Sequence, residues 1–208
     1  MKLIVTAALA TATALATALA VPATAQMPAP GAPDIARIAA GTYAADPRHT
    51  QVEWRINHFG FSEYDGIFGN ATGTLTLDPA HPAAAAVAIE IPVSGLVTTV
   101  TALDTHLKSP DFFDATKFPT VTFKSTRVTF VGTKATITGD LTLHGVTKPV
   151  TLAAHLIGAG ANPISKKATI GFAATATIKR SDFGMTTFLP ALGDTVDLRI
   201  NAAFERSN

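Results

Sequence analysis

The run Ala135–Val150, ATITGDLTLHGVTKPV, decides the fold class of this chain. From Ala135 to Leu143 apolar side chains alternate with threonine and aspartate. Successive side chains of a strand point to opposite faces, so the pattern predicts a strand with one buried and one solvated face. His144-Gly145 then interrupts the alternation, and Gly145 can adopt the positive φ that a tight turn requires. The stretch therefore predicts two antiparallel strands joined by a hairpin.

His144 has two interpretations, as the corner of this hairpin or as a catalytic or ligand-binding group. It continues the polar face of its strand, and Pro149 sets the direction in which the chain re-enters the next strand. A catalytic or metal-ligating histidine needs a partner at matched spacing, and the neighbouring sequence offers none. We therefore predict a structural role for His144.

The same period-two alternation recurs along the chain, separated by turn residues. It is found in Thr50–Asn57, Gly73–Leu77, Val87–Val93, Thr120–Phe123, Val150–Leu156, Ala168–Ile178 and Val196–Phe204. Closely spaced strands of this kind favour antiparallel connections. One interval, Leu96–Phe113, instead has Val100, Leu103 and Leu107 at helical spacing, which predicts a short helix. About eight strands with one helical insertion indicate a β-barrel or a sandwich, and a barrel is favoured because closure removes the open edges.

The N-terminus has the features of a cleaved signal peptide, predicted over residues 1–25. A basic start precedes the uncharged run Leu3–Val21, and Ala23-Thr24-Ala25 fits a cleavage site. The run is rich in alanine and threonine, so no stable membrane span is expected in the mature protein. We expect export to the periplasm, a flexible Pro- and Ala-rich tail over 26–40, and one domain over 41–208.

Composition excludes several functional classes. The chain has no cysteine, so it has no disulfide, no thiolate nucleophile and no cysteine-bound zinc. Its formal net charge is +1 and its basic residues form no block, which argues against nucleic acid as a partner.

Five motifs, taken in order, resemble those of one family. They are Tyr43–Trp54 (YAADPRHTQVEW), His58–Ser62 (HFGFS), Asp104–Asp114 (DTHLKSPDFFD), Gly139–Val150 (GDLTLHGVTKPV) and Arg180–Met185 (RSDFGM). Together they make the chain similar to the YceI-like family of periplasmic polyisoprenoid-binding proteins. The resemblance implies an all-β fold, an eight-stranded antiparallel lipocalin-like β-barrel with a short helical insertion. It also implies that the barrel holds a long-chain lipid, such as a polyprenyl phosphate, an isoprenoid quinone or a fatty acyl chain, and it is compatible with a homodimer.

The predicted ligand site has two parts, an apolar lining and a set of head-group candidates at the mouth. The lining is predicted to be Val52, Trp54, Ile56, Phe61, Phe68, Leu103, Leu107, Phe112, Phe113, Phe118, Val121, Phe123, Ile137, Leu141, Leu143, Leu152, Phe172, Ile178, Phe183 and Met185. The head-group candidates are His58, Ser62, Asp104, His106, Arg180 and Asp182. Arg180 suits a diphosphate, since a guanidinium can donate two parallel hydrogen bonds, but a turn network between Arg180 and Asp182 is an equal alternative.

Other functions find less support in the sequence. The six histidines form no recognised metal-binding motif, and no serine lies in a G-x-S-x-G elbow, so we expect no metal, no cofactor and no catalytic residue. Residues of a small barrel can also fill its interior completely. A filled barrel that binds a partner on its outer face, as a stress-related interaction module, is therefore the alternative to a lipid carrier. An isoprenoid-modifying enzyme is a third hypothesis.

Overall fold

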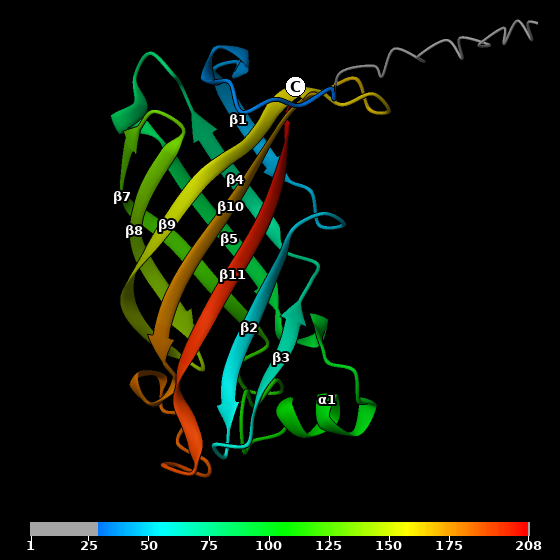
Figure 1. Ribbon diagram of the computed structural model, residues 1–208, viewed down its shortest axis with the longest axis vertical. Helices are drawn as coiled ribbons and strands as arrows, with labels where there is room; N and C mark the ends of the chain where they lie inside the picture. The colour runs from blue at the N-terminus through cyan, green and yellow to red at the C-terminus, as the bar shows by residue number, and fades with distance from the viewer. Residues whose placement is uncertain (1–28, 208) are drawn as a thin grey trace, which may run out of the picture.

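Within residues 29–207, which the computed structural model describes, strand segments form one antiparallel sheet that closes on itself (Figure 1). The segments are β1 (Gly41–Ala45), β2 (Gln51–His58), β3 (Ser62–Phe68), β4 (Thr72–Leu77), β5 (Ala86–Pro92), β6 (Leu96–Val97), β7 (Thr120–Val131), β8 (Lys134–Leu143), β9 (Val146–Ala161), β10 (Ala168–Lys179) and β11 (Leu192–Arg206). The described range also has one α-helix, α1 (Thr101–Leu107), and the 3-10 turns η1 (Ile35–Arg37), η2 (Pro82–Ala84), η3 (Val93–Gly95) and η4 (Arg180–Phe183).

The shorter segments combine into longer strands. β1 and β2 both pair with β11, one after the other, so they act as a single interrupted strand. β3 and β4 pair with β2 and β1 respectively and form a second unit, and β6 and β5 continue beside them as a third. With β7 to β11 this makes an eight-stranded barrel in which each strand neighbours the next and the last pairs with the first. The predicted barrel with a short helical insertion is confirmed.

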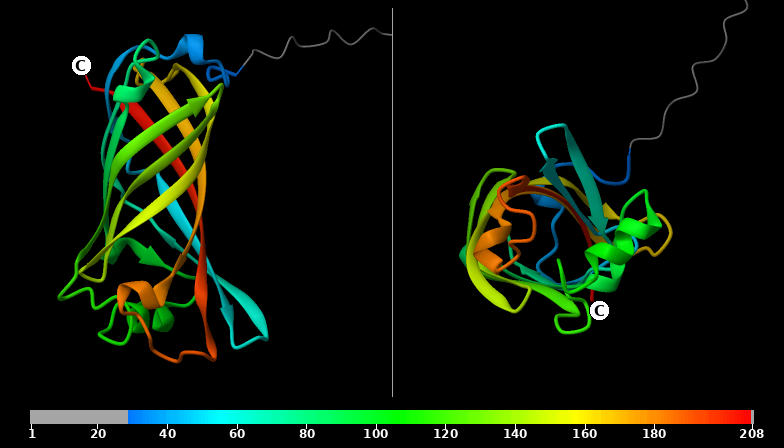
Figure 2. Two further views of the ribbon diagram at one scale, coloured as in Figure 1. Left: turned by 90° about the vertical axis from the view of Figure 1, so that its left-hand side faces the viewer. Right: turned by 90° about the horizontal axis from the view of Figure 1, so that it is seen from below.

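The interruption between β1 and β2 lies at Asp46-Pro47. Proline has no backbone N–H to give to the sheet, and the Asp46 side chain organises the turn instead. One of its carboxylate oxygens accepts a hydrogen bond from the backbone N–H of Arg48 at 2.9 Å, and the other lies 2.5 Å from Nδ1 of His49. After this turn β2 and β3 lean outward from the ring at the lower end of the barrel (Figure 2).

The helical insertion lies at that same end, beside β3 (Figures 1 and 2). Helix α1 falls inside the predicted interval Leu96–Phe113. The loop before it is held by Thr98, whose backbone N–H and hydroxyl both donate to Oδ1 of Asp104 at 2.6 Å. The insertion therefore forms part of one rim of the barrel.

The hairpin predicted at His144 is confirmed. Leu143 pairs with Val146, and both residues of the turn, His144 and Gly145, have positive φ. Nδ1 of His144 lies 3.2 Å from the carbonyl oxygen of Phe183, and its ring packs against Phe118 with centroids 4.7 Å apart. His144 thus ties the β8–β9 turn to η4, as its structural assignment predicts.

The predicted flexible tail over 26–40 differs from the structure in its described part. Ala32 forms a β-bridge with Ala159, and a guanidinium nitrogen of Arg37 donates to the carbonyl oxygens of Pro30 and Ala159. Glycine at position 160 makes this contact with β9 feasible, because a Cβ there would lie 2.2 Å from the Pro30 oxygen. The segment from residue 30 is therefore attached to the barrel. The predicted signal peptide lies outside the described residues.

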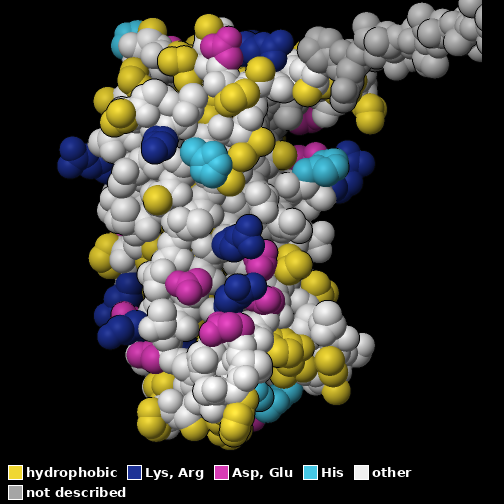
Figure 3. All heavy atoms as spheres, viewed as in Figure 1, with side chains coloured by type: hydrophobic (Ala, Val, Ile, Leu, Met, Phe, Trp, Pro, Cys, Tyr) yellow, Lys and Arg dark blue, Asp and Glu magenta, His cyan; other side chains and the backbone are white. Residues whose placement is uncertain are grey.

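The outer face of the barrel carries charges of both signs. Acidic and basic side chains lie close together over the lower half of the face shown in Figure 3. Arg55 pairs with Asp65 across β2 and β3 at 2.6 Å, and Arg199 lies 3.9 Å from Glu53 across β11 and β2.

Among the helices of residues 29–207, none has the length and apolar character needed to cross a membrane.

Candidate ligand cavity

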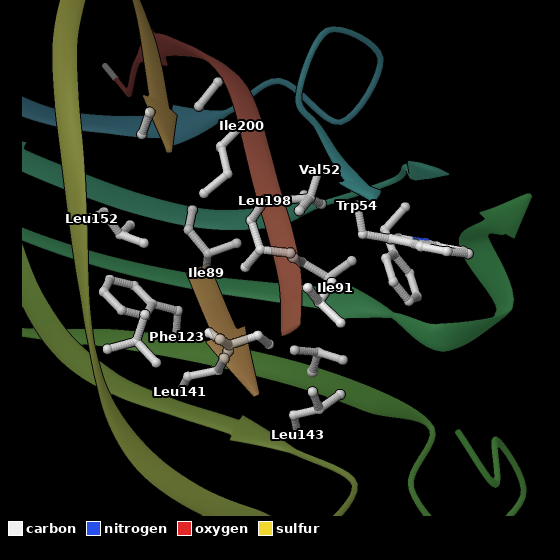
Figure 4. Close-up of a pocket in the computed structure, with 18 of the residues that line it drawn as sticks. Val52, Trp54, Ile89, Ile91, Phe123, Leu141, Leu143, Leu152, Leu198 and Ile200 are labelled. Carbon is white, nitrogen blue, oxygen red and sulfur yellow. The ribbon is translucent and has the colours of Figure 1, made fainter. Parts of the chain in front are cut away.

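The inward faces of the strands enclose one elongated cavity of about 470 Å³. The apolar half of each alternating pattern supplies its wall, as Figure 4 shows for Val52, Ile89, Phe123, Leu141 and Leu198. The sequence left open the alternative of a barrel filled completely by its own side chains. The structure instead has an open interior.

Small side chains in the middle of the barrel help to keep this space open. Ala135 pairs with Ala154, and Ala154 pairs with Ala174, so three adjacent strands present a row of alanines to the interior. A second core cluster, which includes Tyr43, Leu77 and Phe204, lies away from the mouth, and Leu77 and Phe204 also line the cavity.

The open end lies beside α1 and the β2–β3 hairpin. Lining side chains are exposed there and not at the other end, with Phe59 and Phe188 exposed by 39% and 54%. Their rings lie 6.3 Å apart, and Phe188 is equally close to Phe112. The hairpin tip, the helical insertion and the segment between η4 and β11 therefore form the rim of the mouth.

Most of the predicted lining residues border the cavity. These are Val52, Trp54, Ile56, Phe68, Leu103, Leu107, Phe112, Phe113, Val121, Phe123, Ile137, Leu141, Leu143, Leu152, Phe172, Ile178 and Met185. Most lie on strands whose alternation identifies the inward face, or on the helical insertion at the mouth, and Met185 lies in the loop after η4. Their contact with a ligand stays a prediction.

Three predicted lining residues lie elsewhere. Phe61 is 90% exposed, because it sits at the turn between β2 and β3, beyond the last inward position. Phe118 packs on the β8–β9 turn, where a Cβ on Gly145 would lie 2.4 Å from its ring. Phe183 is buried in the lower core and does not border the cavity. All three lie in turns or loops, where side-chain direction does not follow a regular period.

Several lining residues were not in the predicted set. Ile89, Ile91, Leu198 and Ile200 belong to alternating strands, so the same period-two signal could have found them. Tyr64 lies between Glu63 and Asp65, and its inward position is clear only from the pairing of β3 with β2. Phe59 and Phe188 have positive φ in irregular segments and carry no periodic signal.

The head-group candidates divide into two groups. His58, His106 and Arg180 border the cavity, whereas Ser62, Asp104 and Asp182 do not. Ser62 and Asp182 are exposed, and Asp104 is engaged with Thr98. Nε2 of His106 lies 3.3 Å from a carboxylate oxygen of Asp111, and its ring packs on Phe112.

Arg180 is 4% exposed and forms a structural network. Its guanidinium donates to the carbonyl oxygens of Gly193 at 2.7 Å, Met185 at 2.8 Å and Leu192 at 3.0 Å. Burial lowers its pKa, and the nearby Asp194 carboxylate opposes that shift. The acidic residue of this network is Asp194, which accepts from Ser181, and not Asp182 as the sequence suggested. Arg180 therefore holds the segment between η4 and β11 in place.

The polar chemistry of the described residues offers no metal centre. Over residues 29–207 no three histidine or carboxylate side chains come together as a metal site would require. His49 and His81 each pair with a neighbouring aspartate, Asp46 and Asp78, on the exposed surface.

Comparison with known proteins agrees with this architecture. A YceI-like domain profile matches residues 43–204. The protein YceI of Shigella flexneri is 45% identical over 154 residues, which is 74% of this chain and 80% of that protein. The crystal structure of the Campylobacter jejuni YCEI protein shares 30% identity, with a TM-score of 0.65 over 73% of this chain and 90% of that one.

A more distant structure shares the fold alone. It is described as a polyisoprenoid binding domain from Saccharophagus degradans, and it is 11% identical to this chain. It superposes with a TM-score of 0.58 over 79% of this chain and 98% of its own length.

Proposed function

This chain belongs to the YceI-like family, and we propose that it binds a long-chain amphiphile, such as a polyisoprenoid, inside its barrel. The observation that carries the proposal is the cavity of about 470 Å³, whose wall is apolar along its length and whose exposed polar groups lie at the mouth. A cavity of this size falls within the usual range for small-molecule sites, about 300–1,000 Å³. The naming of the Saccharophagus domain as polyisoprenoid-binding supports the same chemical class.

Burial of the ligand's tail supplies the binding energy in this proposal. Each methylene transferred from water into the cavity contributes about 0.8 kcal/mol, from which the cost of ordering a flexible chain is subtracted. Apolar walls discriminate weakly between similar tails, so the protein accepts a range of chain lengths. The ligand enters tail first at the mouth beside α1, between Phe59 and Phe188.

The proposed action is sequestration, without a covalent step. The ionisable side chains at the cavity are dispersed: His58 and His106 lie at the rim, and Arg180 is engaged with three backbone carbonyls. A carrier of this kind is useful where a lipid must cross water. The leader predicted over residues 1–25 and the family resemblance together support the periplasm as that compartment.

Mass spectrometry of the mature protein purified from its own periplasm tests the proposal. Native spectra are recorded first, and the same sample is then extracted with organic solvent. The expected result is one isoprenoid or acyl species at stoichiometric amount. A protein that arrives empty, and that takes up neither polyprenyl phosphates, quinones nor fatty acids, would contradict the proposal.

A further inference from the structure

Two buried polar atoms, on residues that border the cavity, have no hydrogen-bond partner. Among the described residues, Nε1 of Trp54 and the hydroxyl oxygen of Tyr64 are the buried side-chain nitrogen and oxygen atoms without one. Both residues border the cavity. Every other buried polar side chain in this part of the protein is satisfied, so the coincidence of these two in one cavity requires an explanation.

The two donors belong to one face of the β2–β3 hairpin. Trp54 pairs with Gly66, and Ile56 pairs with Tyr64, so Trp54 and Tyr64 are diagonal neighbours on the inward side. Diagonal neighbours in an antiparallel pair lie about 7–8 Å apart. Figure 4 shows the Trp54 indole at one side of the cavity.

The chemistry of the pair selects an uncharged acceptor. An indole N–H can only donate a hydrogen bond, and a tyrosine hydroxyl donates readily. The residues that border the cavity include no carboxylate. Arg180 donates to three backbone carbonyls, and His58 and His106 lie at the rim. A buried unpaired donor is unfavourable, and phenylalanine at either position would avoid it, so packing alone does not account for these side chains.

We infer that Trp54 and Tyr64 form a subsite inside the cavity that donates hydrogen bonds to an uncharged oxygen, such as a carbonyl, of the bound amphiphile. This inference rests on the proposed function and adds to it the class of polar group that the protein selects. The cavity therefore prefers an isoprenoid that carries a carbonyl over an isoprenoid hydrocarbon of equal length.

Farnesylacetone, an isoprenoid methyl ketone, and the hydrocarbon in which its carbonyl is replaced by a methylene are suitable probes. Their dissociation constants are measured with delipidated mature protein, together with the infrared carbonyl stretch of ketone labelled with ¹³C at that carbon. The ketone is expected to bind about tenfold more tightly than the hydrocarbon, since one or two hydrogen bonds are gained. Its carbonyl stretch is expected to shift to lower wavenumber in the complex.

Tyr64→Phe removes one donor and keeps the ring, and Tyr43→Phe is its matched control. Tyr43 is the other tyrosine of the chain; it does not line the cavity, and its hydroxyl donates to the carbonyl of Ala39. We expect Tyr64→Phe to weaken ketone binding about five- to tenfold, with no change for the hydrocarbon. Tyr43→Phe should leave both affinities unchanged. Trp54→Phe provides a second test, because it removes the indole donor. Its readout is the shift of the ketone's carbonyl stretch in the complex.

The possible outcomes separate the inference from the proposed function. If both probes bind with equal affinity and Tyr64→Phe changes neither affinity nor the carbonyl stretch, the subsite is overturned and the lipid-binding function stands. If neither probe binds to the folded protein, the proposed function fails and the subsite with it.

Discussion

The indole ring of Trp54 lies across Gly66 of the adjacent strand, so closely that a Cβ on Gly66 would stand 2.2 Å from Cζ2 of the indole. The two residues are direct partners in the β2–β3 register. Glycine at this position therefore makes room for the largest side chain of the cavity wall. The shape of the cavity near its mouth depends on a residue that contributes no side chain at all.

Gly66→Ala is expected to displace the Trp54 ring and to lower the free energy of unfolding by about 1–3 kcal/mol, the usual cost of overpacking a core. Trp54 is the one tryptophan of the chain, so its fluorescence reports the displacement directly. Gly69→Ala is the control, because a Cβ there would meet nothing within 4 Å. Equal stability and equal emission spectra for the two variants would refute the steric account.

Leu141→Arg is expected to abolish lipid retention, because it places a charge in the cavity wall, where no carboxylate can pair with it. Phe123, its partner on β7, should respond in the same way to Phe123→Asp. Asp140→Arg, one residue along β8 on the exposed face, should retain the lipid. Lipid content is measured by extraction and mass spectrometry after circular dichroism has confirmed folding. A folded Leu141→Arg protein with normal lipid content would show that the interior is not the binding site.

Arg180→Met should destabilise the protein by about 3 kcal/mol, because it leaves the carbonyls of Gly193, Met185 and Leu192 without their donor. Arg180→Lys should restore little of this loss, since an ammonium cannot reproduce the planar fork. The comparison is Arg55→Met, which removes an exposed ion pair with Asp65 and is expected to cost much less stability than Arg180→Met. Urea unfolding measures the stability of all three variants. Similar losses for Arg180→Met and Arg55→Met would be inconsistent with an anchoring role.

Asp194 makes part of the stability depend on pH. Burial would raise its pKa, but hydrogen bonds from the backbone N–H and hydroxyl of Ser181 outweigh this and lower it below the ordinary 3.8. A carboxyl whose pKa is lower in the folded state contributes stability above its unfolded pKa, and this contribution disappears as pH falls through the folded value. Asp194→Asn should therefore be less stable than the parent at pH 7, and the difference should disappear as the pH falls through the folded pKa of Asp194. Thermal unfolding of both proteins at a series of pH values measures this difference in stability. A difference that does not change with pH would contradict the assignment.

The two tyrosines should respond to loss of the hydroxyl in opposite ways. Tyr64→Phe removes an unpaired buried hydroxyl and is expected to leave the ligand-free protein equally stable or more stable. Tyr43→Phe breaks the hydrogen bond to Ala39 and should cost about 1 kcal/mol. Chemical unfolding of delipidated protein distinguishes these cases. A marked loss of stability in Tyr64→Phe would mean that its hydroxyl has a structural partner after all.

The alternation of residues predicted most of the strands and their inward faces, but it did not identify β1, β3 and β6. In Ala135–Leu143, for example, a side-chain period of two assigns each residue to a face whichever strand becomes its neighbour. The His144-Gly145 hairpin was equally accessible, because the conformation of a two-residue turn depends on those two residues. The family motifs added the lipocalin-like form of the barrel and the expectation of a bound lipid.

Tertiary structure decided the features that depend on residues distant in sequence. Period two assigned Val52 and Trp54 to the inside, but it could not reveal that β1 and β2 share β11 as partner, nor that Gly66 accommodates the indole. For the same reason Phe61 was misplaced at the lining and Tyr64 was missed. Local alternation determines which way a strand residue points, whereas pairing between strands decides what it meets there. The sequence alone thus determined most of the lining of the barrel. The mouth, the Arg180 network and the unpaired donors depend on how loops and neighbouring strands meet in the folded chain.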